Sequence, residues 1–282
     1  MPFTGADIGG FHGNFDDAEN EVGEDKGQMF LARFHQVGAF FPFARNHNII
    51  GHPEGEEFID STDQAPYMIT NVDYRAGVQA AFKTRYSLLR HYYTQLFLAQ
   101  RDGTPFFLPA YFFNPEDEKT TDDYESTVMI GRELMVVLPL TEAEEITVYL
   151  PSANNWYHLN LATPHVIVGG NDAIFEDTWT DVNILLRSGS VIVTQHIPEG
   201  LETTKDLLEL PVEMLIFPDS NGQAHGKTYI ADGELLVENH QLWNIAYDVR
   251  TITFSDELSD STAPQDINGN EIISKITVVD SE

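Results

Sequence analysis

Two short polar segments near the start of the chain carry residue types that can bind a neutral, hydroxyl-rich ligand. In the first, Gly5–Phe11 (GADIGGF), the carboxylate of Asp7 precedes two glycines and an aromatic residue. The second, Arg45–Asn48 (RNHN), directly follows the apolar segment Ala39–Phe43. Carboxylates and imidazoles bind hydroxyl groups, and an aromatic ring packs on the C–H face of a sugar. The two segments therefore predict a site for a polyhydroxylated ligand.

Each of these residues also has a purely structural interpretation. Asp7 is able to cap a turn into the following glycines, as single loop aspartates usually do. His47 is able to act as a core histidine bonded to backbone, although its two flanking asparagines favour the rim of a site. Phe11 fits a pocket wall and plain packing about equally well. Arg45 suits the orienting of a carboxylate better than contact with a sugar, because a buried guanidinium needs a partner.

The hydrophobic pattern predicts the elements that hold the two segments. Residues 1–8 read as the end of a strand, and apolar side chains over residues 28–38 have helical spacing. Ala39–Phe43 is predicted to be a buried aromatic strand closed by Pro42. A rigid apolar element would then deliver the polar side chains to its exposed end, which is how folded proteins usually build sites.

A loop over residues 49–70 and one long helix from Asp73 to Gln100 are expected next, with Gly103 as the helix stop. From Thr104 the pattern changes to short β runs separated by turns, which indicates a β-sandwich. The strands predicted there are Phe106–Phe112, Leu134–Leu138, Ile146–Leu150, Val166–Val168, Ile184–Leu186 and Val191–Val193. After a linker over Pro198–Leu208 the predicted strands are Val212–Phe217, Lys227–Ile230, Leu235–Val237, Tyr247–Phe254 and Lys275–Val279.

Both polar segments resemble glycoside hydrolase family 31, the alpha-glucosidase family. They match its G-A-D-x-x-G-F block and, after an arginine-containing helix, its G-A-F-x-P-F-x-R-N-H-N block. Further matches in family order are Tyr86–Leu89, Trp156–Tyr157 and Ile230–Glu234. The sequence of Arg45–Asn48 is more similar to the lysosomal and intestinal alpha-glucosidases than to glucosidase II.

The resemblance implies an α/β fold followed by all-β domains. We expect the C-terminal end of a (β/α)₈ barrel over residues 1–103, a proximal β-sandwich over 104–198 and a distal β-sandwich over 199–282. Asp232–Glu234 is read as a hairpin turn of the distal domain.

The same resemblance assigns substrate-binding roles and no catalytic residue. It implies that Asp7 and His47 contact sugar hydroxyls, Phe11 lines the first subsite and Arg45 lies behind them. A retaining glycosidase needs two carboxyl groups about 5–5.5 Å apart. In the family both lie upstream of G-A-D, in a W-x-D-M-N-E type motif and a later G-D motif, and neither is found here. We therefore expect the C-terminal portion of a retaining alpha-glucosidase, inactive alone, whose partners are an α-glucoside or oligosaccharide and the N-terminal part of the catalytic domain.

Two other functions stay open from the sequence. Two β-sandwiches with an incomplete barrel also fit a non-catalytic carbohydrate-binding or assembly module. An acidic interaction protein without a sugar role would make both motif matches a coincidence.

The composition of the chain limits which other classes of protein it could belong to. With 45 acidic and 15 basic residues the formal net charge is −30, which argues against nucleic acid as a partner. No apolar run approaches the ~20 residues of a membrane span. The chain has no cysteine, and its first residues lack the form of a signal peptide; the resemblance allows a lysosomal or secreted location.

No cofactor and no metal are expected. The histidines lack ligand spacing, among them His12, His35, His52, His91 and His158. The acidic residues around 16–25 do not match the calcium-loop spacing of an EF-hand, and a solvated loop is the favoured interpretation.

Overall fold

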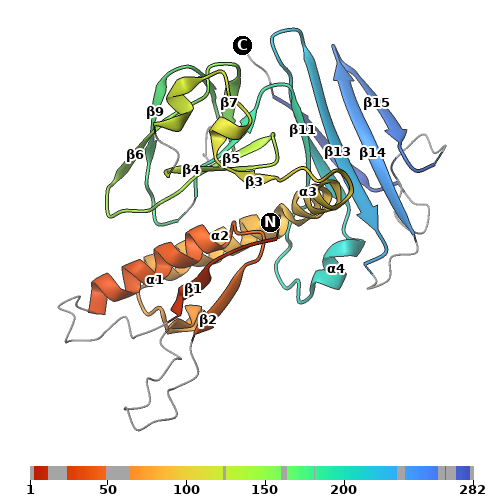
Figure 1. Cartoon of the computed structure of the whole chain (residues 1–282). Helices are drawn as coiled ribbons and strands as arrows, with labels where there is room; N and C mark the ends of the chain where they lie inside the picture. Colours follow the sequence, from red (N-terminus) through yellow and green to blue (C-terminus); the bar gives the residue numbers. More distant parts are fainter. Residues whose placement is uncertain are drawn as a thin grey trace.

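The computed structural model describes residues 3–11, 24–48, 64–122, 125–159, 164–180, 182–233, 239–259, 264 and 271–279. In these ranges a group of helices with a small pair of strands lies against two larger β-sheets (Figure 1). The acidic segment 12–23, most of the loop predicted over 49–70 and the predicted strand Leu235–Val237 lie outside the described residues.

The N-terminal part is an α/β unit. Strand β1 (Asp7–Phe11) pairs in parallel with β2 (Arg45–Asn48), and helix α1 (Glu24–Gly38) lies between them in the sequence. The helix predicted over 28–38 is confirmed and begins earlier. Gly38 is required where α1 meets β1, because a Cβ atom there would lie 2.5 Å from the side chain of Ile8.

The predicted strand over Ala39–Phe43 is wrong, because this segment forms tight turns that continue from α1. The amide of Ala39 donates to His35 O (2.9 Å), and that of Phe41 donates to Gly38 O (3.1 Å). Pro42 has no N–H to offer a strand ladder. The strand begins only at Arg45, within the polar tetrapeptide that had been expected to lie beyond the strand end.

The single long helix expected from Asp73 is two consecutive helices, α2 (Val72–Ser87) and α3 (Leu89–Asp102). Leu88 between them has a φ of −93° and a ψ of 0°. The amide of Gln195, in the β-rich part, donates to Ser87 O (3.0 Å), so that carbonyl is used by a tertiary contact. Gly103, with a φ of 71°, ends α3 as predicted. A 3₁₀ turn, Pro66–Met68, precedes α2.

The first large sheet has the order β3-β4-β5-β10-β7-β8 and is antiparallel throughout. Strands β4, β7 and β9 were not predicted, and the strand predicted over Phe106–Phe112 is only β3 followed by the 3₁₀ turn Ala110–Phe112. A further 3₁₀ turn covers Glu118–Thr121. The strands are β3 (Phe107–Leu108), β4 (Thr127–Ile130), β5 (Leu134–Val137), β7 (Asn155–His158), β8 (Val166–Val168) and β10 (Ile184–Arg187), with β6 (Glu145–Tyr149) and β9 (Asp172–Glu176) as a separate pair.

The second large sheet has the order β15-β14-β13-β11-β12-β16. The strand predicted over Tyr247–Phe254 is wrong, because Val249 and Arg250 have positive φ angles (36° and 79°) and turn the chain from β14 into β15. The predicted linker contains helix α4 (Thr204–Glu209). The strands are β11 (Ser190–Thr194), β12 (Val212–Phe217), β13 (Gln223–Ala231), β14 (His240–Asp248), β15 (Thr251–Asp256) and β16 (Ile273–Val278). The predicted boundary at 198/199 stays a prediction, although β11 already belongs to this sheet.

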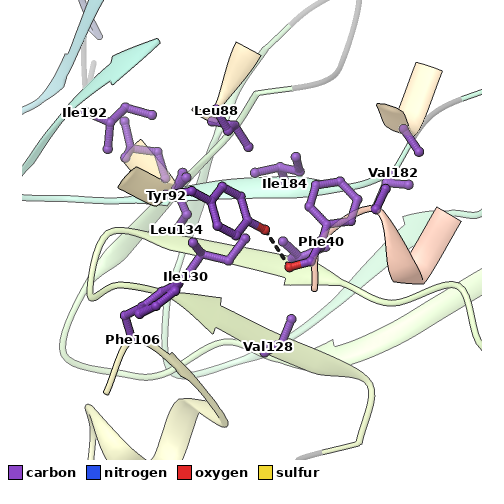
Figure 2. Packing of buried hydrophobic residues seen from close by; sticks show 14 of the residues in the cluster. Phe40, Leu88, Tyr92, Phe106, Val128, Ile130, Leu134, Val182, Ile184 and Ile192 are labelled. Atoms are coloured by element: carbon purple, nitrogen blue, oxygen red, sulfur yellow. Dashed lines mark hydrogen bonds between the residues drawn. The ribbon is translucent and has the colours of Figure 1, made fainter. Parts of the chain in front are cut away.

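The first sheet is buried on both faces, since successive residues point to opposite sides of a strand. In β5, Val136 joins the cluster that faces the helices, whereas Met135 and Val137 join the cluster shared with β6 and β9. Figure 2 shows the helix side, where the hydroxyl of Tyr92 donates to the carbonyl of Phe40 (2.6 Å). The turn after α1 is thereby fixed to α3 inside the core.

An ion pair ties α1 to the β-rich part. The guanidinium of Arg33 makes two hydrogen bonds to the carboxylate of Asp177, at 2.8 and 2.7 Å, and lies 3.6 Å from the ring centroid of Trp179. The side chains are only 9% and 2% exposed. Burial raises the pKa of Asp177, and Arg33 opposes this shift. The pair therefore fixes the position of α1 and, through it, of β1 and β2.

Candidate functional site

The β1–β2 pair brings together the two charged residues of the predicted site. Asp7 lies opposite Arg45 in the parallel register, and Arg45 Nη2 donates to Asp7 Oδ1 at 2.7 Å. The Arg45 guanidinium also lies 5.3 Å from the ring of Phe43. Arg45 therefore orients the Asp7 carboxylate and leaves its second oxygen, Oδ2, without a hydrogen bond to the guanidinium.

The two rings of the predicted site also meet on this strand pair. The centroids of Phe11 and His47 are 5.6 Å apart, with the ring planes inclined at 42°. All four predicted residues thus lie on two adjacent strands. The carboxylate and the guanidinium share one register position, and the aromatic ring and the imidazole lie further along the same strands. This combination offers hydrogen-bonding groups beside a flat apolar ring.

The glycines of the first segment are needed for this geometry. Gly9 and Gly10 have φ angles of 103° and 90°, and Phe11 follows at 69°, a left-handed value that is uncommon for an aromatic residue. The register with β2 shifts between Ile8 and Phe11. The resulting bulge re-aims Phe11 toward His47, and strained backbone of this kind is typical of functional sites.

A polar network that includes the buried residues His35 and Gln64 supports β2 from behind. The amide nitrogen of Asn46 donates to Gln64 O (2.7 Å) and lies 3.1 Å from His35 Nε2, while His35 Nδ1 lies 2.8 Å from Leu31 O. These contacts are satisfied together only if Nδ1 carries the proton and Nε2 accepts. Burial lowers the pKa of His35, which keeps the ring neutral.

Arg85 of α2 holds the turn that leads into β2. Its Nη1 donates to Ala39 O and Phe41 O, both at 2.6 Å, and its Nη2 donates to Pro42 O at 3.3 Å. Sequence reasoning missed both Arg85 and His35 as supports of the site. The position of His35 among the apolar residues of α1 could have indicated that its ring is buried. No feature of the sequence indicated a supporting role for Arg85.

The site is open to solvent on one side. The Asp7 side chain is 32% exposed and that of Arg45 48%, and Phe11 is 39% exposed as a residue. Small-molecule sites usually enclose most of their ligand. Asp7, Arg45 and Phe11 are therefore accessible to solvent and not enclosed by the described residues.

Comparisons with known proteins find similarity along nearly the whole chain. Residues 1–95 match the glycosyl hydrolases family 31 TIM-barrel domain, and residues 103–192 match the glycosyl hydrolase family 31 C-terminal domain. The chain belongs to glycoside hydrolase family 31. The end of the barrel and the β-sandwich part expected from the sequence are thereby confirmed.

Among family 31 proteins, the chain is 28% identical to an uncharacterized glucosidase of Schizosaccharomyces pombe over 99% of its own length and 25% of the relative. It is 28% identical to a probable glucan 1,3-alpha-glucosidase of Oryza sativa subsp. japonica, covering 27% of that protein. The chain thus spans about a quarter of the length of these relatives.

A crystal structure of the glucosidase II alpha subunit has the same fold over 98% of this chain and 28% of that one, with a TM-score of 0.78 at 23% identity. The likeness to the lysosomal and intestinal subgroup, which rests on Asn46 and Asn48, stays a prediction.

Two histidines outside the β1–β2 pair, His35 and His91, are buried in the core. His91 Nε2 lies 3.0 Å from Ile130 O, and His35 is used as described above. Among the residues that the structure describes, no three His, Asp or Glu side chains are grouped as metal ligands. His12, His52 and the acidic residues 16–21 lie outside the described residues. No helix in the described ranges is long and apolar enough to span a membrane.

Proposed function

We propose that this family 31 chain forms one wall of the sugar pocket of a retaining alpha-glucosidase that hydrolyses O-glycosidic bonds of α-linked glucosides. Asp7 and His47 bind hydroxyl groups of the terminal glucose, Phe11 packs on the sugar, and Arg45 orients Asp7. The observation that carries the proposal is the 2.7 Å contact between Arg45 and Asp7 beside the Phe11–His47 ring pair, on adjacent parallel strands.

Physical chemistry supports these roles. A carboxylate fixed by a guanidinium on one oxygen keeps lone pairs for two vicinal hydroxyls. The strand ends are held by the hydrogen bonds between His35 and Asn46 and by Arg85, which favours a fixed orientation of the side chains without a ligand. Relatives named as a glucoamylase and a probable glucan 1,3-alpha-glucosidase support a glucoside as substrate, and similar solved structures also include a dextranase and an alpha-1,4-glucan lyase.

The nucleophile and the general acid/base would come from polypeptide outside these 282 residues, in the same chain or in another. The open side of the β1–β2 pair offers room for that part of the barrel. Exposed aromatic residues on the N-terminal unit, Phe3 at 54% and Phe30 at 51%, provide apolar surface for it to cover. We therefore propose that the 282-residue chain alone does not hydrolyse glycosides.

Hydrolysis of 4-nitrophenyl α-D-glucoside tests the proposal. The purified chain is assayed alone and mixed with a family 31 polypeptide that ends just before the G-A-D block. Activity only in the mixture, lost on substitution Asp7→Ala, is the expected result. Turnover by the pure chain that survives Asp7→Ala would contradict the proposal. A folded but silent mixture that binds maltose in calorimetry would instead favour a non-catalytic carbohydrate-binding module.

A further inference from the structure

A cavity lies where the chain passes from the first large sheet into the second, and its lining residues are remote in sequence from β1 and β2. Its volume is about 520 Å³, within the range of small-molecule pockets. The β4–β5 turn contributes Arg132 and Glu133, the end of β10 contributes Arg187, and the start of β11 contributes Ser190. The other lining elements are the C-terminal half of α3 and the paired strands β13 and β14.

Two arginines of this cavity lack a carboxylate partner in a strongly acidic protein. The chain has 45 acidic and 15 basic residues, so carboxylates are abundant. Within the described ranges, however, neither Arg132 nor Arg187 has a carboxylate oxygen within 4.0 Å. The Nε atom of Arg187 is buried without a hydrogen-bond acceptor. A buried guanidinium nitrogen in this condition is costly and points to a missing acceptor.

The electrostatic environment of Arg187 is unfavourable for its own charge. Burial lowers the pKa of the guanidinium, Glu133 opposes this effect, and the neighbouring charge of Arg132 lowers the pKa further. The carboxylates that line the cavity already have other partners. Asp102 accepts from Arg101 at 2.6 and 2.8 Å, and Glu133 accepts from Gln95 at 3.2 Å. The cavity therefore holds two like charges that an anion would stabilise.

A third donor faces the same space. Ser190 is 1% exposed, lines the cavity, and its Oγ has no hydrogen-bond partner among the described residues. The planar fork of an arginine matches carboxylate and phosphate oxygens, and a serine hydroxyl is able to donate to the same group. We propose that this cavity binds a small oxyanion, the carboxylate or phosphate group of a ligand, through Arg187, Arg132 and Ser190 Oγ.

Titration calorimetry of the 282-residue chain with sodium phosphate and, separately, sodium acetate tests the proposal, with ionic strength held constant by sodium chloride. Saturable binding of at least one anion is expected, and the tighter one identifies the phosphate or carboxylate as the preferred group. Arg187→Met should weaken binding about tenfold or more, because the charge-assisted hydrogen bond to the anion is lost. Arg75→Met, which removes an exposed arginine of α2, is the matched control and should bind as the unmodified chain does.

The proposal is overturned if neither anion gives saturable heat, or if Arg187→Met and Arg75→Met bind equally well. If Arg187→Met does not fold, the exposed Arg132 and the small Ser190 provide the decisive variants. Arg132→Gln and Ser190→Ala should each weaken binding several-fold, and unchanged affinity in both would also overturn it. None of these measurements depends on sugar binding or hydrolysis at β1 and β2.

Discussion

The β1–β2 pair with its site residues, here called the β1–β2 corner, and the packing around α3 differ in how far their side chains are exposed to solvent. Two polar side chains of α3 form hydrogen bonds inside the protein: Tyr92 donates to Phe40 O, and Thr94 Oγ1 accepts from the amide of Tyr229 at 2.9 Å. At the β1–β2 pair, the supporting side chains are also hydrogen-bonded to protein groups, but Asp7 and Phe11 remain partly exposed. The region around α3 buries these polar groups, whereas the corner exposes the side chains to which we assign ligand contacts.

Breaking the link between the two regions should have the largest effect on stability. Arg33→Met would leave the carboxylate of Asp177 buried without its partner, and breaking a buried pair costs about 3–5 kcal/mol. Urea denaturation measures the change in the free energy of unfolding. The control Arg75→Met, on the exposed side of α2, should change it by less than about 0.5 kcal/mol. A loss of similar size in both variants would mean that α1 is not held by this pair.

Removing one hydroxyl from the closed region should cost less. Tyr92→Phe leaves the buried carbonyl of Phe40 without its donor, for an expected loss of about 2 kcal/mol. Tyr67→Phe is the control, because Tyr67 is 70% exposed and should tolerate the change. Equal unfolding temperatures for Tyr92→Phe and the unmodified chain would show that this hydrogen bond contributes little.

Alanine substitutions at two glycines with positive φ angles compare backbone strain with steric crowding. Only one of the two glycines lies at the corner. An added Cβ at Gly9 (φ 103°) would lie 3.1 Å from Gln64 Cβ and 3.2 Å from the Asn46 amide nitrogen, whereas Gly103 (φ 71°) has nothing within 4 Å. Gly103→Ala should cost about 1 kcal/mol from strain, and Gly9→Ala about 1 kcal/mol more. Thermal unfolding of both variants checks the difference, and a smaller loss for Gly9→Ala would refute the packing described for β1.

The smallest expected effect is a pH dependence at His35. Burial lowers its pKa in the folded chain below the ordinary value of 6.5. The unfolded state then binds more protons as the pH falls through 6.5, so stability is lost from that point down to the folded pKa. His35→Gln should flatten this part of the curve of unfolding free energy against pH. An unchanged slope would assign the loss to other groups.

The four site residues singled out from the sequence lie on the adjacent strands β1 and β2, and their binding roles stay predictions. Arg45 was expected to orient a carboxylate that the sequence did not identify, and in the structure its guanidinium donates to Asp7. The strand itself was placed over Ala39–Phe43, since an apolar aromatic run resembles a buried strand, yet carbonyl contacts from Arg85 hold that run as turns. Likewise the break at Leu88 depends on a contact to Gln195, more than 100 residues away, which no local pattern reveals.

The strands β4 and β9 were also missed because their local sequence pattern is not that of a typical half-exposed strand. β4 is buried over its whole length, so it lacks the alternation that marks a half-exposed strand. β9 alternates between exposed and buried residues, but its exposed positions include Asp172 and Glu176, which are depleted in strands. Pairing with β6 overrides that preference.

The most direct test of the central claim is the activity of the completed enzyme with Asp7 altered. In the mixture with the rest of the barrel, Asp7→Ala should lower kcat/KM for 4-nitrophenyl α-D-glucoside about 100-fold, because hydroxyl contacts that strengthen in the transition state contribute several kcal/mol. Gly103→Ala, far from the corner, should leave kcat/KM unchanged. Equal kcat/KM for Asp7→Ala and the unmodified chain would contradict the assignment of the β1–β2 corner as a wall of the sugar pocket.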